Sequence, residues 1–551
     1  MDNPSTGASA EVIFFNGKVV TLDATDRIAQ AVAVKDGRIL AVGSDEEMKG
    51  LANSRTQWID LRKKTMLPGL IDAHTHLAWS TIIFKSYVDG RCPPNRSIPD
   101  VLAKIRERAS QVPPGTWIPV QGSFFANFKF AERRYPTREE LDSAAPNHAV
   151  VFVATVHAAI VNTCALQAAR ITRDTPDPPG GKIERDPATG EANGILREWH
   201  GFLPLMNFTY DQIKQALRDW VPDYWIKQGC TSAHTFADAL EFRAVQELAA
   251  EGRLPVRVRA NFMDIQLGPK PMIDSLVNLG ILPGVGNEWL KVGGVKIFVD
   301  GALMGLSAAT HEPYLNMPSK DYCGILKFDD YRPFEELVRK AHDAGLQLCV
   351  HAIGDKAQDW ALTAYEKALA ANPKPHRHRL EHMGNLMTDR QRISRAKALG
   401  IIPVTTVEWL FEEGDFIEHY LGPARNAQSW PLRSMLDAGL NVANCSDTVG
   451  ATPFSTNPFY SMWSAVTRQT FQGKRLIPEE AISVKEALRL YTTGAAYAGF
   501  EETQKGSIEI GKLADLIVID RDILTIPEDQ IRDIKVERTV IDGRTVYQNL
   551  N

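Results

Sequence analysis

Apolar and polar positions divide this chain of 551 residues into two alternating ends and a long middle zone. In segments 10–23, 29–43 and 534–549, apolar and polar residues alternate with a period of two, which predicts β-strands. The Asn-Gly pair at 16–17 and the Asp-Gly pair at 36–37 interrupt the first two segments and predict hairpin turns. Because neither end could cover its own strand edges, we expect both ends to combine into one small β-sandwich.

The middle zone alternates apolar, strand-like runs with helical stretches. Eight strand candidates begin near Leu67, Cys230, Val256, Gly293, Leu346, His378, Ile401 and Asn441. Helices such as 334–345 and 388–400 lie between the later runs, with apolar positions spaced near 3.6 residues and a closing glycine. Eight β/α units predict an α/β protein with a (β/α)8 TIM barrel, whose catalytic groups would lie at the C-terminal ends of its strands.

One spacing does not fit a simple barrel. About 150 residues separate the first strand from the second, too many for an ordinary β-to-α connection. This stretch contains a helix-like segment, a strand-like segment at 148–162 and a Gly/Pro-rich segment, and we interpret it as a subdomain inserted over the barrel mouth. The resulting domain limits are 1–65 and 503–551 for the sandwich, 66–89 and 205–502 for the barrel, and 90–204 for the insertion.

Composition and charge narrow the class of function. A hydrophobic content of 44% and a charged content of 23% are typical of a globular protein. The net charge of −5 and the absence of a basic run argue against a nucleic-acid partner. The sequence has no signal-peptide pattern and no apolar stretch long enough for a membrane span. Six dispersed cysteines without a CxxC pair indicate reduced thiols, so we expect a cytoplasmic protein. With no sign of a nucleic-acid or membrane partner, we expect it to act on a small molecule.

Polar residues with metal-binding chemistry recur at the predicted strand ends. They are His74 and His76 after the first strand, His351 after the fifth, His382 after the sixth and Asp447 after the eighth, with Lys296 inside the fourth. Residues two apart in a strand share a face, so His74 and His76 can both point inward. Nitrogen and oxygen ligands without thiolate suit zinc best, with manganese, iron and cobalt as alternatives.

Lys296 decides between one metal ion and two. Its neighbours are Val295, Ile297 and Phe298, and a lone cation among them would be costly. A neutral lysine amine can instead take up carbon dioxide and become a carbamate, which can bridge two divalent cations. Water beside such a metal pair is acidified, and Asp447 could bind one metal, accept the proton of that water and return it to the leaving amine.

Each of these residues has a simpler explanation when it is taken alone. A strand-end histidine is more often a hydrogen-bonded core residue, and Lys296 could pair with Asp300. Asp447 could cap a following helix. Six such residues at the same end of one barrel are an improbable coincidence, and the metal site therefore rests on the whole set.

Candidate walls of a substrate pocket follow the same strands or lie in the insertion. They are Trp79, Phe84, Phe124, Phe125, Met304 and Trp409. An aromatic and methionine-rich lining fits a hydrophobic substrate, although these side chains could equally pack the insertion onto the barrel. His157 in the insertion could donate to the substrate carbonyl and stabilise the developing oxyanion, and its alternative is a buried structural histidine.

Two long motifs resemble the amidohydrolase superfamily: LPGLIDAHTH at 67–76 and the C-terminal segment 488–520. Further pieces resemble its YtcJ-like branch, which includes N-substituted formamide deformylases, namely ATVHAAIVNTCAL, ANGILRE, VKIFVDGAL, VHAIGD and RLEHMG. The resemblance covers nearly the whole chain and implies a distorted barrel, a composite β-sandwich, an insertion after strand one, and in many relatives a homodimer. It also implies His74, His76, Lys296, His351, His382 and Asp447 as metal ligands, with Asp447 as the catalytic base.

The function predicted from the sequence is metal-dependent hydrolysis of an amide, formamide or related N-acyl bond. Met304 and Leu306 stand where the branch commonly has a polar contact, which argues against an anionic substrate and for a neutral, hydrophobic or aromatic one. An ester, lactone, carbamate or amidine could be attacked at the same site. A non-catalytic scaffold is a further alternative, but such a protein is expected to lose ligands, and all six positions are filled here.

Overall fold

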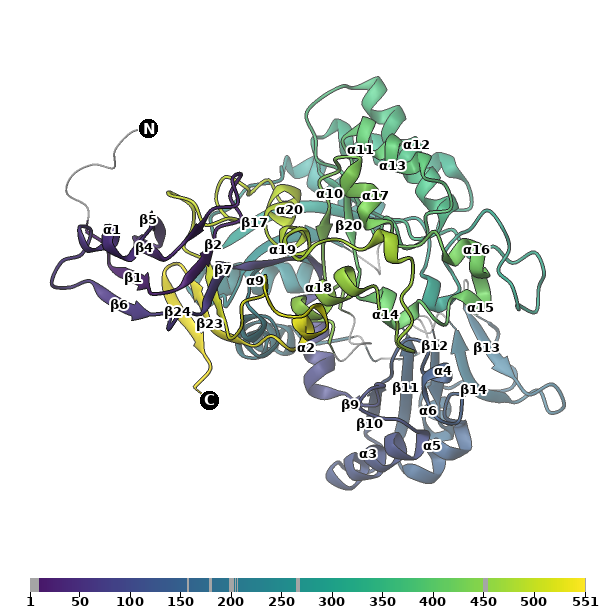
Figure 1. Ribbon diagram of the computed structural model, residues 1–551. Helices are drawn as coiled ribbons and strands as arrows, with labels where there is room; N and C mark the ends of the chain where they lie inside the picture. Colours follow the sequence, from purple (N-terminus) through teal and green to yellow (C-terminus); the bar gives the residue numbers. More distant parts are fainter. Residues whose placement is uncertain are drawn as a thin grey trace.

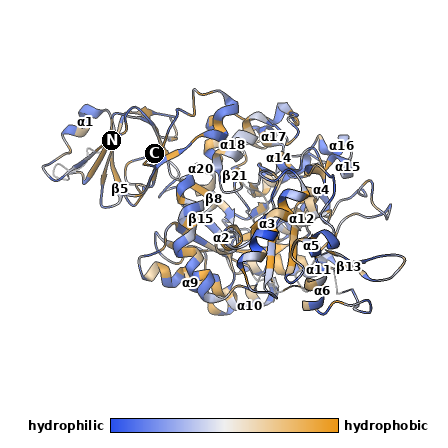
Figure 2. Ribbon diagram, turned by 90° about the horizontal axis from the view of Figure 1, so that it is seen from below, coloured by the Kyte–Doolittle hydropathy of each residue, from blue (hydrophilic) through white to orange (hydrophobic). Residues whose placement is uncertain are grey.

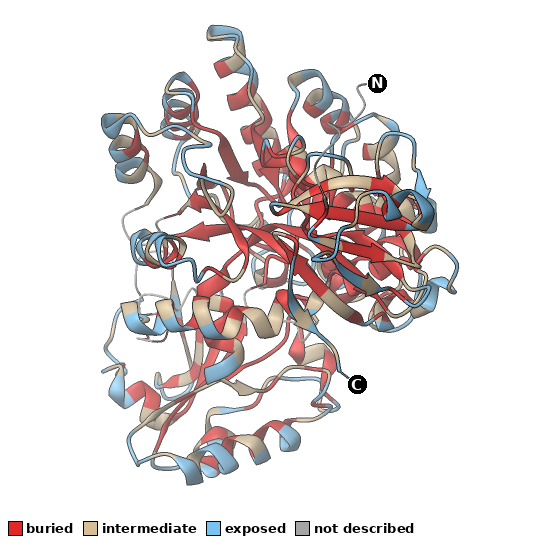
Figure 3. Ribbon diagram, turned by 90° about the vertical axis from the view of Figure 1, so that its left-hand side faces the viewer, coloured by how far each residue is buried: buried red, intermediate tan, exposed pale blue. Residues whose placement is uncertain are grey.

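The computed structural model describes residues 9–155, 158–177, 181–197, 203, 205, 207–263, 268–448 and 454–550. An eight-stranded, entirely parallel sheet forms its centre, and its buried strands run through the middle of the molecule (Figures 1 and 3). In chain order the strands are β8 (Leu70–Thr75), β15 (Cys230–Ala237), β16 (Arg257–Phe262), β17 (Leu290–Phe298), β18 (Leu348–His351), β19 (Arg379–Glu381), β20 (Ile402–Thr405) and β21 (Ala443–Asn444).

The sheet closes into a distorted barrel at one seam. No strand ladder joins the outer strands β8 and β21. Two main-chain groups that follow β21 bridge the seam instead: Ser446 N–H donates to Asp72 Oδ1 at 2.9 Å, and Asp447 N–H donates to His74 O at 2.9 Å. The predicted (β/α)8 barrel is therefore confirmed, and all eight strand positions agree with the sequence pattern.

Helices that cover the barrel follow from amphipathic sequence and from clear end signals. They include α9 (Ala239–Ala250), α10 (Pro269–Leu279), α11 (Tyr331–Asp343), α12 (Asp355–Ala371) and α13 (Gln391–Leu399). In α11, Asp330 caps the first turn, and Phe334, Leu337 and Val338 face the core. Gly400 ends α13 in a left-handed conformation with φ 65°, which glycine adopts at little cost.

Strands from both ends of the chain meet in one six-stranded sheet of order β24-β23-β22-β7-β2-β3. These strands are β2 (Lys18–Val20), β3 (Ile28–Ala29), β7 (Thr65–Pro68), β22 (Leu516–Ile519), β23 (Val536–Ile541) and β24 (Arg544–Gln548). A four-stranded sheet packs against it, made of β1 (Val12–Phe15), β4 (Ala31–Lys35), β5 (Arg38–Gly43) and β6 (Gln57–Asp60). The first and last strands of the chain, β1 and β24, both lie in this part of the molecule (Figure 1).

The Asn-Gly pair at 16–17 does not close a hairpin, and this expectation from the sequence is wrong. β1 and β2 flank the pair, yet β1 pairs with β4 and β6 whereas β2 pairs with β3 and β7. Asn16 adopts a left-handed φ of 55°, and a Cβ at Gly17 would lie 2.4 Å from the Leu61 side chain. The pair therefore turns the chain sharply from one sheet into the other, and only a glycine at position 17 leaves room for the Leu61 side chain.

A third sheet, of order β13-β14-β12-β11-β10-β9, lies between β8 and β15 in the sequence. Its strands are β9 (Val88–Asp89), β10 (Trp117–Gln121), β11 (Ala149–Thr155), β12 (Ala158–Val161), β13 (Lys182–Arg185) and β14 (Ala192–Arg197). Helix α3 (Ile98–Gln111) lies beside these hydrophobic strands (Figure 2) and buries Val101 and Ile105 among Val120 and Phe152. The domain limits given above stay a prediction.

The six cysteines are free, as the sequence predicted. Cys230, Cys349 and Cys445 are fully buried within the barrel, where burial raises the pKa of each thiol. Among the described residues, no helix combines the length and the hydropathy needed to cross a bilayer.

A buried ion pair fastens the barrel to the terminal sheets. Arg257 at the start of β16 donates from Nε to Asp515 Oδ2 at 2.7 Å and from Nη2 to Oδ1 at 3.1 Å, and both side chains are nearly inaccessible. We expect Asp515→Ala to leave a buried guanidinium without its main counter-charge and to lower the free energy of unfolding by about 3 kcal/mol. The exposed pair of Lys49 and Glu46 provides the control.

Urea denaturation of wild type, Asp515→Ala and Glu46→Ala measures this difference. Glu46→Ala should cost less than about 1 kcal/mol because exposed ion pairs contribute little. Equal losses in the two variants would contradict the role of the buried pair.

Candidate metal centre

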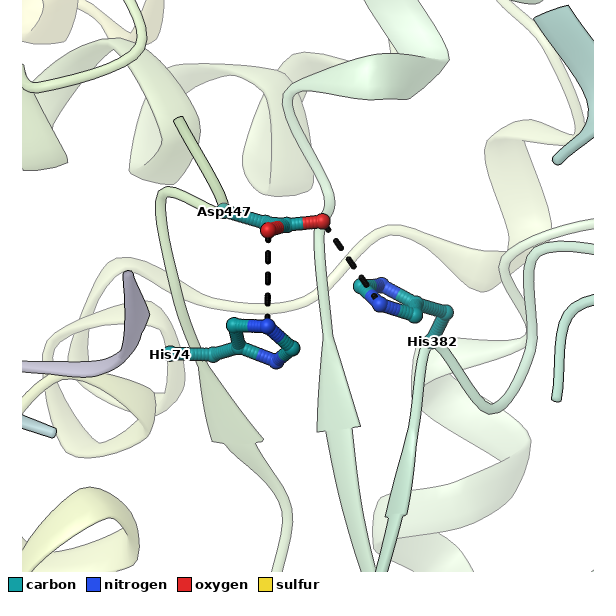
Figure 4. Close-up of side chains that lie close together, drawn as sticks. All are labelled: His74, His382 and Asp447. Atoms are coloured by element: carbon teal, nitrogen blue, oxygen red, sulfur yellow. Dashed lines mark ion pairs between the residues drawn. The ribbon is translucent and has the colours of Figure 1, made fainter. Parts of the chain in front are cut away.

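Three imidazoles, those of His74, His76 and His382, converge on one buried carboxylate at the C-terminal ends of the barrel strands. Figure 4 shows two of them, His74 and His382, beside Asp447. Asp447 Oδ1 lies 3.4 Å from His74 Nε2 and 3.4 Å from His76 Nε2, and its Oδ2 lies 3.5 Å from His382 Nε2. His74 is in β8, His76 follows that strand directly, and His382 follows β19. Strands of one parallel barrel end on the same side, so residues far apart in the sequence meet here.

A buried carboxylate and guanidinium fix the orientation of His74. Its Nδ1 lies 2.7 Å from Glu381 Oε2, and Arg379 in turn holds Glu381 through two bonds of 2.7 and 2.9 Å. Arg379 also donates to the carbonyl of Ala73 at 2.7 Å. With Nδ1 donating to Glu381, the lone pair of Nε2 points toward Asp447, which is the usual support for a metal-binding histidine.

His382 is held by a hydrogen bond at the edge of its ring and by an aromatic ring stacked on its face. Its Nδ1 lies 3.0 Å from Thr406 Oγ1, and the Trp409 ring stacks on it with centroids 5.3 Å apart and planes 8° apart. Its Nε2 is buried and has no hydrogen-bond partner among the described residues. His382 and Asp447 both have a positive φ, 65° and 32°, a conformation that is strained for residues with a side chain and that occurs often at functional sites.

Lys296 is fully enclosed beside the first histidine. Its Nζ lies 3.1 Å from His74 Nε2 and sits over the rings of Phe236 and Phe298, 4.4 and 4.8 Å from their centroids. Burial lowers the pKa of this amine from its ordinary value, although the charges of Glu381 and Asp447 oppose the shift. This amine therefore loses its proton more readily than that of an exposed lysine.

His351 lies at the edge of the cluster. Its ring is 4.7 Å from the ring of His382, but its Nε2 lies 3.1 Å from the carbonyl oxygen of Gly301 and 3.8 Å from Asp300. Asp300 accepts main-chain N–H groups of Ala309, Ile353 and Gly354, which ties the loops after β17 and β18 together. The structure therefore links five of the six predicted ligands through contacts with His74 or Asp447, and it places the sixth, His351, beside His382.

The charge state of the cluster suits a cation. Burial lowers the pKa of His74 and of His382 well below the ordinary value, which keeps both imidazoles neutral. Burial alone would raise the pKa of the Asp447 carboxyl, but the interactions of that carboxylate with His74, His76 and Lys296 outweigh burial and hold the pKa below its usual range. Neutral imidazoles, an ionised carboxylate and the unpartnered Nε2 of His382 are a donor set that fits a divalent metal such as zinc.

Four of the predicted pocket residues share one buried cluster next to this centre. Phe124 and Phe125 come from the insertion, Met304 from the turn after β17 and Trp409 from the start of α14 (Trp409–Glu413). The ring of Phe124 meets that of Trp409 edge-on at 5.7 Å, so the insertion contacts the residue that stacks on His382. These four side chains belong to one buried apolar cluster, and Trp409 joins that cluster to the metal centre.

The other predicted substrate-site residues that the structure describes, Trp79 and Phe84, are not members of this cluster. Trp79 stacks on His76, with ring centroids 5.7 Å apart and planes 16° apart. Phe84 lies five positions further along α2 (Leu77–Ser86), where its ring stacks on Tyr224 and under the guanidinium of Arg91. His157 lies outside the described residues, and its role stays a prediction.

Arg379 and His234 were not assigned a role from the sequence. Arg379 Nη1 lies 3.2 Å from Nδ1 of the fully buried His234, whose pKa burial lowers to about 4. The available signal was the strand HRLEH at 378–382, in which a basic and an acidic residue two positions apart share one face of an otherwise apolar strand. Alternating charges of that kind inside a predicted barrel strand indicate a buried ion pair.

A parallel (β/α)8 barrel with imidazoles and a carboxylate at the ends of its strands is an architecture of metal-dependent hydrolases. A model of the amidohydrolase family matches residues 57–547. This protein belongs to the amidohydrolase family, and the resemblance seen in the sequence is confirmed.

Individual relatives match along almost the whole chain. It is 32% identical to an N-substituted formamide deformylase of Arthrobacter pascens, over 98% of each sequence. It is 31% identical to the putative amidohydrolase YtcJ of Bacillus subtilis, over 98% of this chain and 99% of the relative. A crystal structure of an uncharacterized metal-dependent hydrolase from Pyrococcus horikoshii has the same fold, with a TM-score of 0.72 at 24% identity over 94% of this chain and 99% of that one.

A buried glutamate next to the metal centre makes stability depend on pH. Glu241 accepts from Thr235 Oγ1 at 2.8 Å, and that hydroxyl accepts the N–H of Leu77, the residue after His76. Burial raises the pKa of Glu241 from 4.5 to about 8. Between these values the folded protein keeps a proton that the unfolded chain releases, so the free energy of unfolding falls as pH rises through this window.

We expect Glu241→Gln to remove this loss. Thermal unfolding is measured at pH 5.5 and 8. Relative to wild type, the free energy of unfolding of the variant should be higher at pH 8 than at pH 5.5 by at least about 1 kcal/mol. The exposed Glu46→Gln variant should follow wild type at both pH values. A parallel response of Glu241→Gln and wild type would contradict the assignment.

Proposed function

We propose that this protein hydrolyses a carbon–nitrogen bond, of the amide, formamide or N-acyl type, in a small, neutral, hydrophobic or aromatic molecule. The observation that carries the proposal is the convergence of three imidazoles on one ionised carboxylate, with the aromatic ring of Trp409 stacked on His382. Membership of the amidohydrolase family and the likeness to a formamide deformylase support the choice of bond.

His74, His76, His382 and Asp447 are the residues that we propose hold the first divalent ion, for which zinc fits best. Such an ion would supply Lewis-acid polarisation of the scissile carbonyl and would acidify a nearby water. Glu381 would position His74 and Thr406 would position His382, each through the Nδ1 atom.

Asp447 is the proposed proton carrier. Its carboxylate is ionised because His74 and His76 offset the effect of burial on its pKa. It can therefore accept a proton from the attacking water and return it to the leaving nitrogen, which converts a poor amide leaving group into a neutral amine. The buried, largely apolar cluster of Trp409, Phe124 and Met304 would exclude bulk water from one side of this exchange and favour an apolar substituent on the nitrogen or the acyl carbon.

Amine release from neutral N-aryl and N-alkyl formamides and amides tests the proposal, with metal-loaded protein and a matched set of esters and lactones. We expect turnover of the amides and formamides, and a loss of about 100-fold or more in Asp447→Asn because the proton carrier is removed. Asp36→Asn, at an exposed turn of the terminal sheets, is the matched control and should retain full activity.

Circular dichroism and bound-metal content establish that Asp447→Asn is folded and still loaded. Turnover of esters only would overturn the bond assignment. Amide turnover that survives in a folded, loaded Asp447→Asn variant would overturn the role of Asp447.

Lys296 and His351 are the residues that we propose for a second ion. Carboxylation of Lys296 joins the neutral amine nitrogen to carbon dioxide with release of one proton, and it gives an anion beside His74 in an apolar pocket. That burial and that neighbour support the proposal, since an unmodified cation there lies close to imidazoles without an ion pair of its own among the described residues.

Metal analysis of Lys296→Met tests the second ion. We expect two zinc ions per wild-type chain and at most one in the variant, together with a carbamate carbon signal after labelling with 13C-bicarbonate that only wild type shows. Lys49→Met, an exposed lysine, should match wild type. Two ions in Lys296→Met, or wild type without a carbamate signal, would contradict the bridging role.

A further inference from the structure

A second cleft lies at the opposite end of the barrel from the metal centre. Its residues precede strands or stand at their beginnings, such as Lys291 in β17, Gln347 before β18 and His378 before β19. The cleft has a volume of about 660 Å³, which lies in the range of roughly 300–1,000 Å³ typical of small-molecule sites. A barrel needs no cavity of this size at this end in order to pack its core.

The cleft is lined mainly by basic side chains. Arg259, Lys291, Lys374 and Arg377 line it, together with three histidines, whereas Glu288 is the one carboxylate in its lining. Several of these cations already have partners: Lys291 lies 3.2 Å from Glu501, and Arg377 pairs with Glu502 through two bonds. Arg259 differs from them.

Arg259 is a buried guanidinium without a carboxylate in direct contact. The charge of Glu501 acts on it only from beyond ion-pair distance, and Glu501 already pairs with Lys291 and Lys505. Arg259 is only 1% exposed, and its Nη2 donates to the neutral Gln347 Oε1 at 3.2 Å. Its Nε has no hydrogen-bond partner among the described residues, and no carboxylate of that part of the chain lies within 4 Å of the group. An isolated buried charge is costly, and a guanidinium does not escape the cost by losing its proton.

The other fully buried arginines show how unusual this is. Arg257 forms a bidentate pair with Asp515, and Arg379 does so with Glu381. Arg468 donates to three main-chain carbonyls, those of Leu476, Trp430 and Ser429. Only Arg259 of these four has a single, neutral partner.

An aromatic ring completes the cleft. Phe500 is 45% exposed, and its ring lies 5.7 Å from the guanidinium of Arg259 and 4.6 Å from that of Arg377. Lys291 Nζ stands at the same cleft, where it also donates to Gln504 at 2.7 Å. A positive floor beside an exposed aromatic face matches a molecule with an oxyanion at one end and an apolar body.

We propose that this cleft binds a small organic oxyanion, whose carboxylate or phosphate pairs with Arg259 and whose apolar part packs on Phe500. The site is separate from the metal centre, and the proposal does not depend on which bond the enzyme hydrolyses. Lys291 would add a second positive charge at the mouth of the cleft.

Isothermal titration calorimetry of the metal-loaded protein with benzoate, phenyl phosphate and inorganic phosphate tests the proposal. We expect one binding event per chain for benzoate, for phenyl phosphate, or for both. The anion that binds more tightly shows whether the cleft prefers a carboxylate or a phosphate. Binding should weaken about tenfold or more in Arg259→Gln. It should weaken severalfold in Lys291→Gln and in Phe500→Ala, and Lys49→Gln, a distant exposed lysine, should bind like wild type.

A metal centre can also attract anions, so the same titrations are made with His74→Asn. Binding retained in His74→Asn but weakened in the cleft variants supports the proposal. Binding lost in His74→Asn, binding unchanged in all three cleft variants, or no heat with any of the three anions would overturn it. If Arg259→Gln does not fold, Lys291→Gln and Phe500→Ala decide, because neither side chain is fully buried.

Discussion

The seam between the first and last barrel strands is the contact on which the metal centre depends. Asp72 accepts the N–H and the hydroxyl of Ser446 at 2.9 and 2.6 Å, and the next residue, Asp447, donates its N–H to the carbonyl of His74. Closing the barrel and placing the central carboxylate against the first imidazole are therefore one event. Any change that loosens the seam moves Asp447 relative to His74 and His76, even when every ligand is still present.

Much of the fold could be predicted because the barrel strands are short apolar runs bounded by helices with clear ends, and the ligands directly follow those runs. The orientation of His74 could not, because Arg379 and Glu381 look like any charged pair until the strands are neighbours. The turn at Asn16 was misinterpreted because a left-handed residue serves a hairpin and a sheet-to-sheet corner equally well. Phe84 comes shortly after the first strand, which is why it was a candidate pocket residue, and its place in the sequence does not say which way α2 points its ring.

Buried polar groups, some of them charged, form a continuous line through the barrel. Glu501 pairs with Lys291 at the second cleft and lies 3.8 Å from His234, which contacts Arg379, which holds Glu381, which orients His74. Each charge on this line is compensated by its neighbour, as a low-dielectric interior requires. The metal centre and the cleft with Arg259 thus lie at the two ends of one polar path in an otherwise apolar core.

The composite sheet also affects how the chain can be made. Strand β7 leads directly into β8 and the first ligands, but its antiparallel partner β22 lies about 450 positions later, where Leu516 pairs with Pro68. At a ribosomal rate of about 5–20 residues per second, the apolar edge of β7 waits tens of seconds for that partner. A nascent chain of this kind exposes a strand edge for most of its synthesis, and we expect that edge to be open to non-native pairing until the last strands emerge.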